Sequence, residues 1–176
     1  MCSTGEGCRV GTGKFKTFRG YQLEEQDRML LTPSMEDYLE MIYRMHLEGG
    51  PVRISQLSKQ LNVKASSATR NVQRLAQRGL VDYERYEAVQ LTPRGERLGK
   101  FLLERHRLVQ EFLEFIGVED TLLKDTEMIE HNISNHALEV MQIFVAFLKD
   151  HPGILEEYRA YRRDVTKGSS DDATPG

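Results

Sequence analysis

Apolar residues recur at helical spacing in several separate segments of the chain. Between Ser34 and Leu47 they follow one another at three- and four-residue intervals, which is typical of a helix with one buried face. Thr32 or Ser34 suits the helix cap, and Pro33 suits the first helical position. Gly49-Gly50-Pro51 would end the segment. The pattern predicts a helix over Ser34–Leu47.

Two shorter helices follow, joined by a tight turn. Leu57 and Leu61 predict a compact helix over Ser55–Leu61, and Asn62-Val63-Lys64 turns the chain. A second helix is expected over Ala65–Gln77, with Gly79 placed to stop it. A helix, a short turn and a second helix form the geometry that lays the second helix in the major groove of DNA.

A β-wing and a helical region complete the predicted organisation. The segments Leu80–Tyr86 and Val89–Leu91 are expected to pair as strands around Glu87-Ala88. Helices are then expected over Glu96–Ile116, Thr121–Lys124, His136–Asp150 and Ile154–Arg163. The apolar face of the segment His136–Asp150 is broad enough to pack on a second copy of the chain.

These elements predict a mainly α fold with a small β-wing. We divide the chain into a flexible N-terminal extension (1–31), a winged helix-turn-helix domain (32–95), a helical dimerisation domain that begins with a long linking helix (96–164) and a polar tail (165–176). The chain has 176 residues, enough for one sizeable core or two small subdomains.

Charge is distributed unevenly along the chain. Residues 51–107 contain 12 Lys and Arg against 5 Asp and Glu, whereas residues 108–164 contain 5 against 12. The basic half favours binding to a polyanion, with chance composition as the alternative. The outward side of the second short helix and the wing carry the residues expected to contact double-stranded DNA: Ser66, Ser67, Thr69, Arg70, Gln73, Arg74 and Arg85.

Composition argues against a membrane or secreted protein. The longest apolar run is too short to span a bilayer, and no secretory signal opens the chain, so a cytoplasmic location is expected. Cys2 and Cys8 lie in a polar, glycine-rich opening segment and are interpreted as thiols of a flexible tail rather than a disulfide or a metal site.

Candidate metal ligands lie near residue 130. In a helix, Glu127, Glu130 and His131 would share one face, where they could form a solvated stripe or most of a metal site. Asp37 and Glu40 share a face of the first helix, although Glu40 could instead pair with Arg44 at i+4. Taken alone, His106 suggests an ordinary helical histidine.

The motifs together, in this order, resemble the DtxR-type metal-dependent repressors, and specifically their manganese-sensing MntR branch. The motifs are Thr32-Pro33-Ser34-Met35-Glu36-Asp37-Tyr38-Leu39-Glu40, the winged helix-turn-helix, Leu91-Thr92-Pro93-Arg94-Gly95, Arg105-His106 and Glu127-Met128-Ile129-Glu130-His131. The resemblance covers roughly Leu31 to Asp150. It implies a homodimer that binds an operator and represses manganese-uptake genes.

The resemblance also implies a two-metal site for Mn²⁺ in each subunit. Its ligands would be Asp37, Glu40, His106, Glu127, Glu130 and His131. The iron-sensing branch resembles this chain with Met at position 37 and Cys at position 127. Carboxylates there harden the site toward manganese. The chain also stops too early for the SH3-like third domain of that branch, and it departs from the family pattern at Ala65, where Pro is common.

Three other interpretations compete with a manganese-responsive repressor. The chain could sense iron or zinc within the same family. It could be a two-metal hydrolase, although no nucleophile constellation accompanies the ligands. It could also be a DNA-binding dimer that no longer depends on metal. We expect that the chain is not an enzyme.

Overall fold

The computed structural model describes residues 31–85 and 87–171. Its first helices are α2 (Pro33–Leu47), α3 (Ile54–Gln60) and α4 (Ala65–Gln77), each within one or two residues of the range that the sequence predicts. The N-terminal extension proposed for residues 1–31 lies outside the described residues, apart from Leu31.

Local chemistry explains how these helices begin and end. The Thr32 hydroxyl accepts a hydrogen bond from the Met35 amide, and Pro33 occupies the first turn of α2. At the end of α4, Gly79 takes a left-handed φ of 67°, while the Leu80 amide donates to the Leu75 carbonyl. Gly79 therefore stops α4 as the sequence predicts, and the chain turns directly into the wing.

The wing is a short antiparallel pair of strands. β1 (Val81–Asp82) and β2 (Gln90–Leu91) pair with Val81 opposite Leu91. The predicted strands were longer, over Leu80–Tyr86 and Val89–Leu91. Pairing stops where the chain leaves the core, because the residues just before the tip are partly or fully exposed and have no face to bury. Tyr86 itself is not among the described residues.

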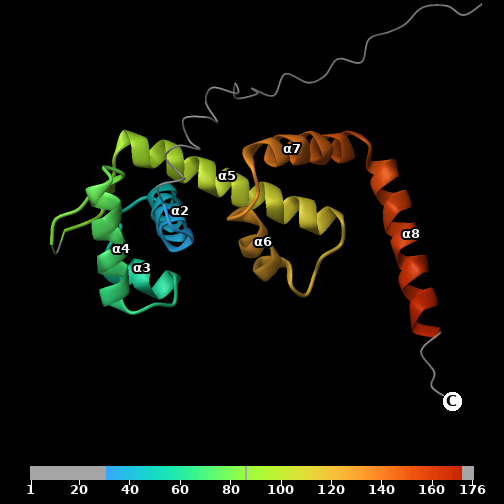
Figure 1. Ribbon diagram of the computed structural model, residues 1–176, viewed down its shortest axis with the longest axis horizontal. Coiled ribbons are helices and arrows are strands. Elements are labelled where there is room, and N and C mark those ends of the chain that lie inside the picture. The colour runs from blue at the N-terminus through green and yellow to red at the C-terminus, as the bar shows by residue number, and fades with distance from the viewer. Residues whose placement is uncertain (1–30, 86, 172–176) are drawn as a thin grey trace, which may run out of the picture.

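The long helix α5 (Pro93–Phe115) is the central element of the molecule (Figure 1). Its N-terminal turn packs under the wing, and Thr92 caps it by accepting a hydrogen bond from the Gly95 amide. Further along, α2 crosses α5 closely at Gly99, where an added Cβ would lie 2.7 Å from the Tyr43 Cβ. The core gathers around this crossing and includes Leu39, Ile42 and Leu102.

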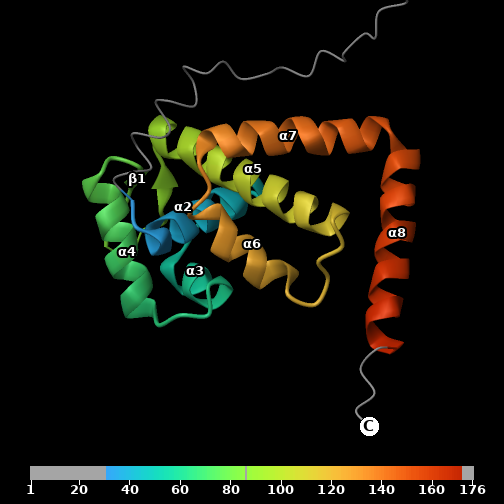
Figure 2. The same ribbon diagram turned by 45° about the vertical axis from the view of Figure 1, so that its right-hand side comes forward.

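The C-terminal helices are α6 (Leu122–Glu130), α7 (Asn135–Asp150) and α8 (Pro152–Asp171), and α6 and α7 both pack on α5 (Figures 1 and 2). α6 is one helix rather than a short helix followed by a separate stretch. Thr126 is fully buried and donates its hydroxyl to the Leu122 carbonyl, which joins the two parts. α8 extends to Asp171, beyond the predicted Arg163, and continues through Gly168.

The architecture agrees with the fold class expected from the sequence. It is mostly helical, with one two-stranded sheet in the described residues. That part of the chain shows no SH3-like β-domain. None of its helices combines the length and apolarity needed to cross a bilayer.

Candidate metal centre and DNA-binding surface

Three helices bring acidic and imidazole side chains together beside the core. Glu40 of α2, His106 of α5 and Glu130 of α6 are all buried, and each offers one ligand atom within 4.8 Å of the other two. His106 Nδ1 lies 3.0 Å from Glu130 Oε2 and 4.0 Å from Glu40 Oε1. Two carboxylates and an imidazole at these separations could hold one divalent ion.

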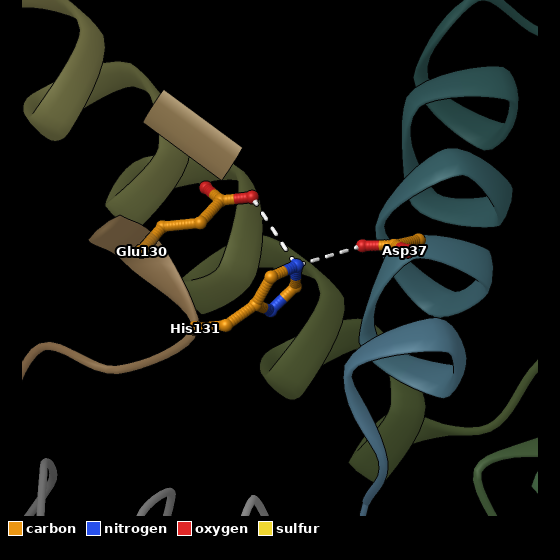
Figure 3. A group of neighbouring side chains, drawn as sticks. All are labelled: Asp37, Glu130 and His131. Atoms are coloured by element: carbon orange, nitrogen blue, oxygen red, sulfur yellow. Dashed lines mark ion pairs between the residues drawn. The ribbon is translucent and has the colours of Figure 1, made fainter. Parts of the chain in front are cut away.

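A second group shares Glu130 (Figure 3). His131 Nε2 lies 3.1 Å from Asp37 Oδ1 and 3.9 Å from Glu130 Oε1. These three residues also place ligand atoms within 4.8 Å of one another. Glu130 therefore directs one oxygen toward each histidine, which is the geometry of a carboxylate that could bridge two ions.

Glu127 is placed differently from the other predicted ligands. Its side chain is exposed on α6, and it belongs to neither of the two groups found among the described residues. His131 is the C-cap of α6 and keeps right-handed helical backbone angles, with φ −74° and ψ −20°. The structure thus gathers Asp37, Glu40, His106, Glu130 and His131, and leaves Glu127 at the surface.

Glu36 and Arg105 are parts of this site that the sequence did not single out. Glu36 is buried, and its Oε2 accepts a hydrogen bond from Arg105 Nη2 at 2.8 Å. The same oxygen lies 2.8 Å from His131 Nδ1, opposite the edge that faces Asp37. Such a contact fixes the orientation of a metal-binding imidazole. The available signal was their position next to Asp37 and His106, but an acid in the first turn of a helix is usually exposed.

The electrostatics of the site favour a bound cation. Hydrogen bonds that the His131 ring donates to the carboxylates of Asp37 and then Glu36 raise the pKa of His131 to about 9, from 6.5. Burial raises the pKa of Glu40, while the charges of His106 and Arg44 oppose that change. A metal ion would stabilise the ionised carboxylates and would need the neutral imidazole, so its binding is coupled to proton release.

The donor chemistry fits a hard or borderline divalent ion. Both groups offer carboxylate oxygens and imidazole nitrogens, and neither includes a sulfur atom. Residues of α2 and residues of α5–α6 contribute to both, so an ion held there would join the helix-turn-helix region to the C-terminal helices.

The residues predicted to contact DNA lie mostly on the outer side of the molecule. α4 lies far from α6 in both views (Figures 1 and 2). Ser66, Arg70, Gln73 and Arg74 are exposed on it, as is Arg85 in the wing. Ser67 and Thr69 are half-buried, and the Thr69 hydroxyl donates to the Ala65 carbonyl of its own helix at 2.9 Å.

Two families match consecutive parts of the chain. Residues 30–89 match the family described as "Iron dependent repressor, N-terminal DNA binding domain". Residues 92–158 match "Iron dependent repressor, metal binding and dimerisation domain". Asp37 and Glu40 lie in the first match, whereas His106, Glu130 and His131 lie in the second.

Individual relatives match about three quarters of the chain. The chain is 40% identical over 130 residues to the HTH-type transcriptional regulator MntR of Lysinibacillus sphaericus. These aligned residues make up 73% of this chain and 94% of the relative. It is 42% identical over 130 residues to the regulator of the same name from Listeria welshimeri, with 73% and 92% covered.

Solved structures show the same fold in longer chains. A structure described as a manganese-dependent transcriptional repressor in complex with manganese is 30% identical, with a TM-score of 0.58 over 64% of this chain and 53% of that one. The manganese regulator SloR is 27% identical, with a TM-score of 0.59 over 66% and 55%. The chain spans about half the length of these two structures. From both domain matches and the identities to its relatives, the chain belongs to the iron-dependent repressor family of DNA-binding, metal-dependent transcriptional regulators.

Proposed function

We propose that this protein is a Mn²⁺-responsive transcriptional repressor that acts as a homodimer on double-stranded operator DNA. The observation that carries the proposal is the position of Glu130 between two ligand groups, each completed by a residue of α2. A regulator needs a site that joins its sensing and DNA-binding parts, and this arrangement supplies one.

Manganese is favoured over iron by the donor set. The proposed ligands of a two-metal site in each subunit are Asp37, Glu40, His106, Glu127, Glu130 and His131. Glu127 would have to turn inward to join the other five. Oxygen-rich sites select against soft metals, and a solved relative is described as a manganese-dependent repressor in complex with manganese.

Regulation would follow from the position of the ligands. Ions held between α2 and the α5–α6 pair would favour one orientation of the DNA-binding region, and hence one spacing of the two α4 helices in a dimer. By linkage, DNA would raise the affinity for metal by the same factor by which metal raises the affinity for DNA. The targets suggested by the family resemblance are manganese-uptake genes.

The DNA contacts and the domain limits belong to the same proposal. The proposed contacts are the side chains of Ser66, Ser67, Thr69, Arg70, Gln73, Arg74 and Arg85. The proposed domains are residues 32–95 for DNA and residues 96–164 for metal and dimerisation. The proposed place of action is the cytoplasm, and the proposed role is regulation rather than catalysis.

The decisive experiment is a DNA-binding titration at fixed salt. A duplex selected from a random pool by the Mn²⁺-treated protein would be titrated with protein in Mn²⁺, Fe²⁺, Zn²⁺ or EDTA, because phosphate contacts make affinity depend strongly on ionic strength. We expect binding at least about tenfold tighter in Mn²⁺ than in EDTA, within the usual range of allosteric coupling. Glu130→Gln should lose this increase.

The matched control for that variant is Glu114→Gln, which removes one negative charge from an exposed position of α5. It should respond to Mn²⁺ like the unmodified protein. Stronger activation by Fe²⁺ than by Mn²⁺ would refute the manganese assignment. Metal-dependent hydrolysis without DNA affinity would favour the hydrolase instead.

A further inference from the structure

Arg44 contacts a proposed ligand of the candidate metal centre but is not itself a proposed ligand. It follows Glu40 by one helical turn of α2, and the i+4 ion pair considered from the sequence is formed. Its Nε and Nη2 atoms donate to Glu40 Oε1 at 2.9 Å and 2.6 Å. Both hydrogen bonds end on the same carboxylate oxygen, so the guanidinium contacts only one of the two oxygens that Glu40 could offer to a metal ion.

That oxygen is the one that faces the other ligands. Glu40 Oε1 lies 4.0 Å from His106 Nδ1, inside the group that Glu130 completes. A divalent ion that used this oxygen would share it with a permanently charged guanidinium. Two like charges on one oxygen repel each other, and the repulsion is stronger at the edge of a buried site than in bulk water.

We propose that Arg44 is an internal competitor that lowers the metal affinity of this site and so sets the concentration at which the protein responds. In the metal-free protein it neutralises Glu40. When metal enters, Arg44 has to release or share Oε1. This inference rests on the proposed function, because it concerns the same site.

The surroundings favour competition over a positioning role. The Glu40 side chain is 10% exposed, whereas that of Arg44 is 36% exposed, so the guanidinium can turn into water when displaced. A positioning arginine would be expected to hold a carboxylate through both oxygens as a fork. Here both nitrogens contact the oxygen that faces His106.

The test measures Mn²⁺ affinity directly in the full-length protein, by isothermal titration calorimetry without DNA. Arg44→Met removes the charge and keeps an unbranched chain, Arg44→Gln is a polar second variant, and Arg44→Lys retains the charge. We expect Arg44→Met and Arg44→Gln to bind Mn²⁺ about three- to tenfold more tightly, a modest change because partial exposure screens the repulsion. Arg44→Lys should stay near the unmodified protein.

A control variant separates this local effect from a general change of charge. Arg97→Met removes an exposed positive charge from α5, nine residues before His106. That separation is about 13 Å along a helix, beyond the screening length of about 8–10 Å at physiological salt. Its Mn²⁺ affinity should therefore be unchanged.

Thermal unfolding gives a second measurement. In EDTA, Arg44→Met should unfold at a lower temperature than the unmodified protein, because Glu40 loses the partner that neutralises it. Added Mn²⁺ should raise the unfolding temperature of Arg44→Met by more than it raises that of the unmodified protein. Unchanged Mn²⁺ affinity in both neutral variants would overturn the competition. Weaker affinity would also overturn it and would show that Arg44 positions Glu40. If the unmodified protein bound no Mn²⁺, the proposed function would fail and this inference with it.

Discussion

Two ionisable side chains at the candidate metal centre are almost completely shielded from water. The side chain of Glu130 is 3% exposed and that of Arg105 is 0% exposed. Removing such groups from water costs free energy unless a partner of opposite charge or a hydrogen bond offsets it. Here a close contact with His106 offsets this cost for Glu130, and the ion pair with Glu36 offsets it for Arg105.

His131 gives the metal-free protein a defined pH dependence. Its pKa is about 9 in the folded protein and 6.5 in the absence of these contacts. Because the folded value is the higher one, protonated His131 stabilises the fold fully below pH 6.5, and this contribution is lost as the pH rises through 9. In EDTA, the difference in unfolding free energy between the unmodified protein and His131→Gln should shrink from pH 6 to pH 9.

Denaturant unfolding at several pH values measures this difference in unfolding free energy. Because the other titrating groups are present in both proteins, their contributions cancel in the difference. A difference that stays constant over that range would contradict the assignment of the charge to His131.

The sequence predicted most of the residues that the structure gathers at the candidate metal centre, but not how they are arranged. The order of motifs and their family resemblance led to Asp37, Glu40, His106, Glu130 and His131, which the structure brings together. The Glu36–Arg105 pair was missed because burial of a charge depends on contacts between distant segments. The exposure of Glu127 was missed because helical spacing shows which residues share a side of a helix, but not which of them are buried by neighbouring segments.

At the scale of elements, the start of α5 depends on a close approach to the wing. The Leu80 carbonyl oxygen occupies the space next to Gly95, where an added Cβ would lie 1.8 Å from it. Thr92 supports the same junction, since its hydroxyl donates to the Gly79 carbonyl at 2.8 Å. The wing therefore has a fixed attachment to the helix that carries His106.

Gly95→Ala should destabilise the protein by about 1–3 kcal/mol, the usual cost of adding a methyl group where there is no room. The obstacle is backbone, so a change of side-chain rotamer cannot relieve the contact. Urea unfolding at fixed protein concentration measures the change. Gly153→Ala is the control, because nothing lies within 4 Å of its added Cβ, and it should be neutral or slightly stabilising. Equal stabilities of the two variants would refute the close contact.

Helix positions were more predictable than strand lengths. The predicted range Ala65–Gln77 matches α4 at both ends. Its apolar spacing indicates a helix over this segment, and Gly79 indicates the same C-terminal end. The wing strands were predicted too long, since β-favouring residues such as Tyr83 do not by themselves create a surface to pair against. α6 was predicted in two pieces because its apolar pattern is weak, whereas burial of Thr126 makes it continuous.

At the scale of the whole molecule, the buried ion pair between Glu36 and Arg105 joins the two family domains. Glu36 belongs to the segment matched to the DNA-binding domain, and Arg105 to the segment matched to the metal-binding domain. Among the described residues, Arg105 Nε and Nη1 have no hydrogen-bond partner, so Glu36 is the main anchor of this guanidinium. The pair joins α2 to α5 beside the candidate metal centre.

Arg105→Met should lower the unfolding free energy in EDTA by roughly 2–3 kcal/mol, somewhat less than the cost of leaving a buried charge uncompensated. The smaller figure reflects His131, which still contacts Glu36. Urea denaturation at fixed protein concentration provides the measurement. Arg107→Met removes an exposed charge two residues away and should change stability by less than about 0.5 kcal/mol. If the two variants lose equal stability, the buried pair does not hold the domains together.

The separation of the ligands along the chain has a consequence for the life of the protein in the cell. Glu36 and His131 are 95 positions apart, and their contact closes the site. Contacts between such distant positions form only when most of the chain has folded, and a chain still being synthesised has not yet made α6 when α2 is complete. The centre thus comes into existence only with the finished fold, so that incomplete or misfolded chains cannot take part in metal sensing.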